Sequence, residues 1–224
     1  MKVLIRNCTI YDGTGAPAFV GSVGFERGKM RVFLPSETPQ AEQTIEASGL
    51  ALVPGFIDAH SHGDLTMTSA FATASKLSQG ITTQIAGQCG VSLFPAGGAD
   101  GGQFERFVSG IAPYPDLPED RALLSSMSGF SRWLEEISNP ITTRCFVGHG
   151  TLRLFAMGYA NRRPDTCELE KMKRILRESI RAGALGLSTG LVYAPSCYAD
   201  NEEILALLRV VAEEGGVYAT HPRN

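Results

Sequence analysis

Alternating apolar and polar residues open the chain and predict short β-strands. Val3, Ile5 and the run 8–10 alternate with polar neighbours, and turn residues follow at 12–15 and 27–29. A period of two residues is typical of strands that bury one face. Residues 1–54 are therefore expected to form part of a small β-sandwich domain, and a segment this short needs strands from elsewhere to complete it.

Beyond residue 54, strand-like runs alternate with helix-like runs. A helix is expected over about 68–79. Two more helices are expected to begin at capping boxes, because Asp165 with Glu168 and Asp200 with Glu203 have the required spacing. Glycines at 183 and 215 end these two helices. The expected strands cover residues 55–61, 81–86, 141–147, 184–188 and 216–221.

Strands that alternate with helices predict a parallel sheet. Polar residues follow the expected strand ends, where a barrel gathers its active site, whereas an open sheet would spread them along one edge. The need for these residues to meet favours the barrel, and no Gly-x-Gly-x-x-Gly turn or P-loop supports a nucleotide fold. The predicted fold class is therefore α/β, with residues 55–224 forming a partial (β/α)8 TIM-type barrel of about five βα units.

Two histidines one residue apart make the strongest candidate site. On a strand, His60 and His62 would point to the same side, and two imidazoles aimed at one point begin a divalent metal site. His221 ends the fifth expected strand and Cys89 follows the second, so both are further candidate ligands, with a buried packing role as the alternative. His149 could be a ligand, a substrate contact or a structural donor, and the structural role is favoured.

Charge and cysteine content indicate which partners and which cellular compartment to expect. The 224 residues carry a net charge of −3 and lack a basic cluster that would bind nucleic acid. No apolar run approaches the ~20 residues of a membrane helix. The five cysteines have no paired spacing, which is typical of a reducing compartment. We therefore expect a cytoplasmic protein with neither nucleic-acid nor membrane partners.

Five runs along the chain form a recognisable series of motifs. They are PGFIDAHSHGD (54–64), GITTQIAGQCGVS (80–92), GHGTLR (148–153), GALGLSTGLVYAP (183–195) and GGVYATHPRN (215–224). In this order they resemble the amidohydrolase superfamily and, within it, the D-aminoacylase (N-acyl-D-amino-acid deacylase) branch, and the resemblance extends from the first β segment to the last residue. The His-x-His pair indicates only the superfamily, whereas the cysteine after the second strand and the STGLVY run are much more specific.

The resemblance implies a set of zinc ligands. Cys89 and His221 would ligate a tightly held Zn²⁺, whereas His60 and His62 would belong to a neighbouring site that is more weakly occupied. Tyr193 falls where the branch has a residue near the substrate.

The chain also departs from common patterns of the superfamily. Many members hold two metals with a carboxylated lysine on strand four, but the nearest lysine here, Lys173, belongs to the preceding helix. Gln88 stands where the branch more usually has asparagine. We expect this second difference to affect substrate details and not the class of reaction.

The implied reaction is hydrolysis of the amide bond of a small-molecule N-acyl-D-amino acid. Zinc lowers the pKa of water and polarises the carbonyl, and in this branch an aspartate at the end of strand eight moves the proton. Because the sequence stops at Asn224, that aspartate and a zinc histidine on strand six are expected beyond it, and Asp58 and Asp64 do not replace the aspartate. We therefore expect the N-terminal portion of a longer enzyme, completed by its C-terminal half or by an oligomer partner.

Two alternatives remain open from the sequence. A cyclic-amide hydrolase of the hydantoinase or dihydroorotase kind is the first, and the missing strand-four lysine argues against it. A truncated remnant with no reaction of its own is the second.

Overall fold

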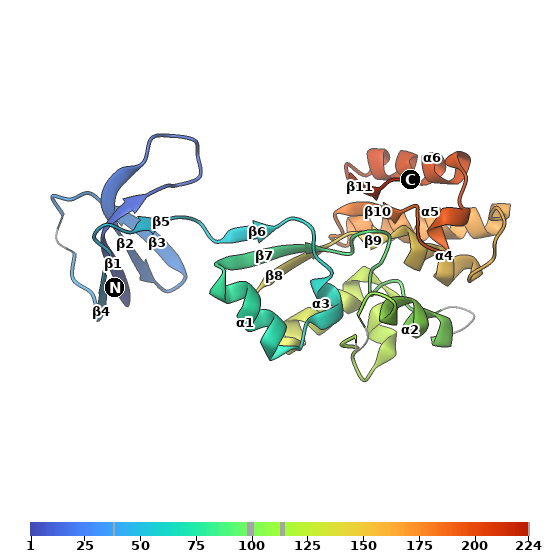
Figure 1. The fold of residues 1–224 in the computed structure, drawn as a ribbon, viewed down its shortest axis with the longest axis horizontal. Helices are drawn as coiled ribbons and strands as arrows, with labels where there is room; N and C mark the ends of the chain where they lie inside the picture. The colour runs from blue at the N-terminus through green and yellow to red at the C-terminus, as the bar shows by residue number, and fades with distance from the viewer. Residues whose placement is uncertain (38, 98–100, 113–114, 224) are drawn as a thin grey trace. The chain divides into compact units, whose positions relative to one another are not determined.

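A computed structural model of the chain describes residues 1–37, 39–97, 101–112 and 115–223, so the terminal Asn224 lies outside the described residues. The chain divides into two units, Met1–Gly55 and Phe56–Asn224 (Figure 1). The boundary expected from the sequence lies between residues 54 and 55. Each unit is described separately below.

The N-terminal unit is one five-stranded sheet around a small apolar cluster. Strand β1 pairs antiparallel with β2 and parallel with β4 and β5, and β2 continues antiparallel to β3. Alternation points Cys8, Ile10 and Val23 to one side, where they pack with Ala47. The strands are β1 (Val3–Ile10), β2 (Phe19–Glu26), β3 (Lys29–Phe33), β4 (Gln43–Glu46) and β5 (Ala51–Leu52).

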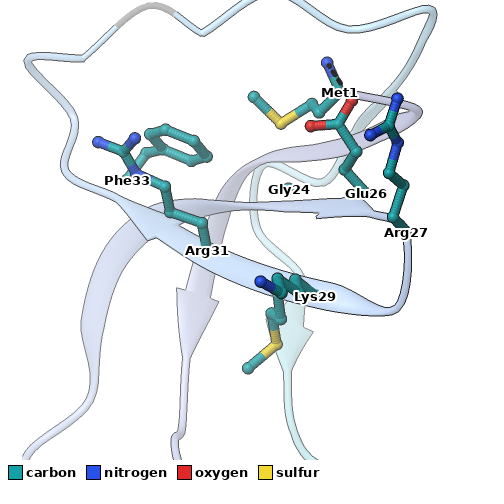
Figure 2. A pocket seen from close by; sticks show the side chains of 8 residues that line it. Met1, Gly24, Glu26, Arg27, Lys29, Arg31 and Phe33 are labelled. Atoms are coloured by element: carbon teal, nitrogen blue, oxygen red, sulfur yellow. Dashed lines mark ion pairs between the residues drawn. The ribbon is translucent and has the colours of Figure 1, made fainter.

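A hollow of about 560 Å³ lies on this unit at the β2–β3 hairpin (Figure 2). Its polar lining comes from the cations Arg27, Lys29 and Arg31 and from Glu26, together with the amino-terminal Met1. Neither histidine nor cysteine lines it. The hollow therefore lacks the imidazole and thiolate ligands that zinc sites commonly use.

The second unit contains the parallel strands predicted for a barrel. Two three-stranded sheets have the orders β6-β7-β8 and β9-β10-β11, and every pairing in them is parallel. Phe146 is the single residue between β8 and β9. Its N–H donates to the carbonyl of Ala86 on β7 (3.0 Å), so the parallel hydrogen bonding of the first sheet continues to the start of the second. The strands are β6 (Phe56–Asp58), β7 (Ile81–Ala86), β8 (Thr142–Cys145), β9 (Val147–Gly148), β10 (Gly186–Gly190) and β11 (Val217–His221).

Within the described part of the chain, these strands do not close into a barrel. Strands β6 and β11 each have a neighbour on one side only. The α/β class and the partial barrel that the sequence predicted are therefore confirmed. No helix among the described residues combines the length and apolar character needed to cross a membrane.

Helices connect and cover these strands. Most of them contribute to one apolar core, in which Phe130, Leu152, Met172, Leu176 and Leu207 are fully buried. The helices are α1 (Ala70–Ser78), α2 (Gly101–Ser109), α3 (Met127–Ile137), α4 (His149–Met157), α5 (Thr166–Arg181) and α6 (Asn201–Glu213), with short 3₁₀ turns η1 (Gly63–Thr66), η2 (Arg121–Ser125) and η3 (Ser196–Tyr198).

The two predicted capping boxes have different outcomes. At α5 the box is complete, because the Asp165 side chain accepts from the N–H of Glu168 and the Glu168 side chain accepts from the N–H of Asp165. At α6 Asp200 accepts from the N–H of Glu203 (2.9 Å), but the Glu203 carboxylate points into the protein and pairs elsewhere. The second box was therefore predicted wrongly: tertiary partners outcompete the local hydrogen bond.

Candidate metal centre

Three of the predicted ligands lie together in the second unit. The potential ligand atoms of His60, His62 and Cys89 all lie within 4.8 Å of one another. The Cys89 Sγ is 3.3 Å from the His60 Nε2, and the two imidazole rings stand edge to face with their centroids 6.0 Å apart. Two imidazoles and a thiol around one point are a donor set suited to zinc.

The two histidines converge because the chain turns, and not because they alternate along a strand. Strand β6 ends at Asp58, and His62 directly precedes the turn η1. The N–H of His60 donates to the Asp58 Oδ1 (3.3 Å), and the N–H of Ser61 donates to the carbonyl of Ile85 on β7 (3.0 Å). The predicted strand over 55–61 is thus too long, although the two rings do come together.

A turn with left-handed backbone presents Cys89. Residues Gly87, Cys89 and Gly90 have φ values of 70°, 53° and 76°, and this region is unfavourable for most side chains. The turn also packs against β10, since a Cβ on Gly190 would lie 2.1 Å from the carbonyl oxygen of Cys89. The left-handed conformation at Cys89 is therefore imposed by its surroundings.

The electrostatics of the cluster fit a divalent cation. Burial lowers the pKa of His62, and the neighbouring His60 lowers it further, so the imidazole stays neutral and able to coordinate. The His62 Nδ1 is buried and has no hydrogen-bond partner among the residues that the structure describes. Burial also raises the pKa of the Cys89 thiol, which a bound cation would reverse. The orphaned nitrogen and the thiol make these residues a good match for zinc.

The two nearby aspartates do not join the cluster. Asp58 forms an ion pair with Lys76 (2.5 Å). Asp64 is fully buried, and burial raises its pKa to about 7; its two carboxylate oxygens have no hydrogen-bond partner among the described residues. Among the described residues, neither carboxylate belongs to the group of potential ligands.

His221 and Tyr193 form a second pair one strand away from Cys89. His221 is the last residue of β11 and lies in register with Gly190, the glycine that packs against the Cys89 carbonyl. The Tyr193 hydroxyl is 3.4 Å from the His221 Nδ1, and the two rings are perpendicular. His221 does not belong to the group formed by His60, His62 and Cys89 in the described chain.

His149 anchors a buried polar network that the sequence did not reveal. It begins α4, and its Nε2 lies 2.8 Å from the Glu203 carboxylate while its Nδ1 lies 3.0 Å from the Ser196 hydroxyl. Arg153 forms an ion pair with the same Glu203, and all of these side chains are buried. This geometry agrees with the structural role favoured for His149.

A hollow of about 420 Å³ lies beside Tyr193. Aromatic side chains of Phe107 and Tyr159 and the cation of Arg106 contribute to its lining. Val91, two residues after Cys89, lines it as well. One wall of the hollow therefore comes from the segment that directly follows the Cys89 turn.

Comparison with known proteins gives consistent matches. The model of the amidohydrolase family matches residues 43–218. The chain is 31% identical to a D-aminoacylase and 33% identical to an N-acyl-D-aspartate deacylase, both of Alcaligenes xylosoxydans xylosoxydans, and each match covers 99% of this chain. These matches cover 44% and 43% of the two relatives, so the chain spans less than half of their length.

A solved structure of an N-acyl-D-glutamate deacylase from Bordetella bronchiseptica, complexed with zinc and a phosphonate inhibitor, has a similar fold. It matches with a TM-score of 0.83 and 33% identity. The match covers all of this chain and 45% of that protein.

Proposed function

Because the chain belongs to the amidohydrolase family, we propose that the protein is a zinc-dependent hydrolase that removes the acyl group from N-acyl-D-amino acids. The observation that carries this proposal is the cluster of His60, His62 and Cys89 at the ends of neighbouring parallel strands. The deacylase relatives supply the substrate class, and the zinc complex of one of them supports the choice of metal.

Four residues are proposed to hold the metal. His60, His62 and Cys89 offer one nitrogen or sulfur each, and His221 is proposed as a further ligand, of a second ion if two are bound. When bound, zinc supplies Lewis-acid chemistry, which makes water more acidic and the amide carbonyl more electrophilic.

The organic part of the substrate is assigned to the surface beside Tyr193. The hydroxyl of this residue, now directed at His221, can donate a hydrogen bond to a carboxylate or carbonyl oxygen. The adjoining hollow, with its aromatic walls and the Arg106 cation, has the chemistry to accept an acyl group or an amino-acid side chain. We assign the proton-transferring carboxylate to a part of the protein outside this sequence, because the chain spans less than half the length of its deacylase relatives.

The test is hydrolysis and zinc content of the full-length protein with Cys89→Ser. We expect wild type to bind zinc and to cleave N-acetyl-D-amino acids, and the variant to lose both properties. The matched control is Cys167→Ser, because Cys167 is an exposed free cysteine on α5. Cleavage of hydantoins with no action on N-acetyl-D-amino acids would favour the cyclic-amide alternative. The absence of any turnover would favour the non-catalytic one.

A further inference from the structure

We infer that Gln88 is a positioning residue that fixes the distance between Cys89 and His60. The side-chain amide of Gln88 donates to the carbonyl of Ala59 (3.1 Å). Gln88 precedes one proposed ligand and Ala59 precedes the other, so this hydrogen bond ties together the two segments that carry them. The inference rests on the proposed metal centre.

The bond is well placed to resist movement. Gln88 is only 3% exposed, so its amide has little access to water as a replacement partner. Residues 59 and 88 are 29 positions apart in the sequence, and the β6–β7 pairing ends before either of them, at Asp58 and Gln84. Beyond the paired strands, two hydrogen bonds set the spacing of these segments: the bond from the Ser61 N–H to the Ile85 carbonyl (3.0 Å) and the bond from Gln88 to the Ala59 carbonyl.

The other side of the Cys89 turn is already held. The buried hydroxyl of Ser188 on β10 accepts from the N–H of Gly90 (3.1 Å) and donates to the carbonyl of Gly87. The carbonyl of Gly90 accepts from the N–H of Gly150 at the start of α4 (2.8 Å). These contacts fix the turn toward β10 and α4, and Gln88 ties it toward the His60 segment.

The length of the side chain matters for this role. Asparagine at position 88 would keep the amide but would be one methylene shorter, so it would fall short of the Ala59 carbonyl in the present backbone arrangement. Methionine would keep the length and shape but would offer no donor. Each change should therefore let the Cys89 sulfur move relative to the His60 ring.

The experiment measures zinc affinity of the full-length protein by competition with a chromogenic chelator, for wild type, Gln88→Met and Gln88→Asn. We expect both variants to bind zinc about tenfold more weakly, the size of effect seen when a supporting hydrogen bond around a metal site is removed. Cobalt substitution adds a signature that stability alone would not change. The thiolate-to-cobalt absorption band should weaken or shift in both variants.

Gln79→Met is the matched control. The amide of Gln79 also donates to a backbone carbonyl, that of Ser75 (2.9 Å), but this bond lies within the exposed end of α1. The control should bind zinc and cobalt as wild type does. Wild-type affinity and an unchanged cobalt spectrum in Gln88→Met would overturn the inference, and if that variant does not fold, the same result in Gln88→Asn would do so. A wild-type protein that binds no zinc would instead overturn the metal-centre proposal together with this inference.

Discussion

Replacing Glu203 with glutamine should reveal how much the second unit depends on its buried charges. The carboxylate accepts from His149 and pairs with Arg153, and the side chains of all three are no more than 1% exposed. Burial opposes ionisation of Glu203, but the hydrogen bond to His149 and the charge of Arg153 outweigh it and keep its pKa below the usual value. Glutamine keeps the shape and leaves the Arg153 cation buried without a counter-charge.

Removing one partner of a buried ion pair costs about 3 to 5 kcal/mol, because the remaining charge loses its compensation. A domain of ordinary stability has only about 5 to 15 kcal/mol in total, so Glu203→Gln should remove a large part of the free energy of unfolding. The adjacent Glu202 provides the control. Its side chain is 81% exposed and pairs with Arg163, which is 69% exposed, so Glu202→Gln should cost at most about 0.5 kcal/mol.

Urea unfolding followed by tryptophan fluorescence suits this comparison. The chain has one tryptophan, Trp133, and it lies buried in the core that α4 and α6 share, so the signal reports on the second unit. Arg153→Met combined with Glu203→Gln should recover part of the loss, since no uncompensated charge remains, although the carbonyls of Ala160 and Arg162 lose their donor. A loss below about 1 kcal/mol in Glu203→Gln, or additive effects of the two changes, would refute this reasoning.

Two further predictions follow from local contacts. The hydrogen bond from Arg162 lowers the pKa of Glu168 from its ordinary 4.5 to about 2. The ionised carboxylate therefore stabilises the fold fully at pH values above 4.5, and this stabilisation is lost as the pH falls toward 2. The stability difference between wild type and Glu168→Gln, about 1 kcal/mol at neutral pH, should therefore shrink over this window in urea titrations; a constant difference would contradict it. Gly190→Ala should cost about 1 to 3 kcal/mol and weaken zinc binding, because the new Cβ would lie 2.1 Å from the Cys89 carbonyl oxygen; unchanged zinc affinity would show that the turn can move freely.

The regular elements were largely predictable from local pattern. The helix signalled by Asp165 begins at Thr166, and the helix signalled by Asp200 begins at Asn201, because a cap and an apolar stripe are local features. The same local signal was misleading for Glu203. Its true partners His149 and Arg153 are about 50 residues away in sequence, and nothing in a four-residue motif can report on them.

The sequence indicated which residues form the candidate site, but not how the backbone brings them together. His60 and His62 come together although they do not lie on a strand, since the bend after Asp58 replaces the expected alternation. His221 ends its strand as expected, and its ring lies against Tyr193, a contact that the sequence did not indicate. Gln88 stood out in the sequence only as a departure from the asparagine usual in the branch, and its bond to Ala59 could not be predicted because Ala59 contributes only a backbone carbonyl.

The left-handed backbone at Cys89 limits which other ligands this protein could acquire there. Besides glycine, the residues that best tolerate such φ values are asparagine, aspartate and histidine, so aspartate is the one carboxylate that suits the turn without rebuilding it. Cys89→Asp would exchange a soft sulfur for a hard oxygen, and relative affinity should move from zinc toward manganese or magnesium, which competition titrations can measure. The shape of one turn thus favours aspartate over glutamate as a replacement donor, because glutamate is less able to adopt the left-handed backbone, which costs most residues about 1 to 2 kcal/mol.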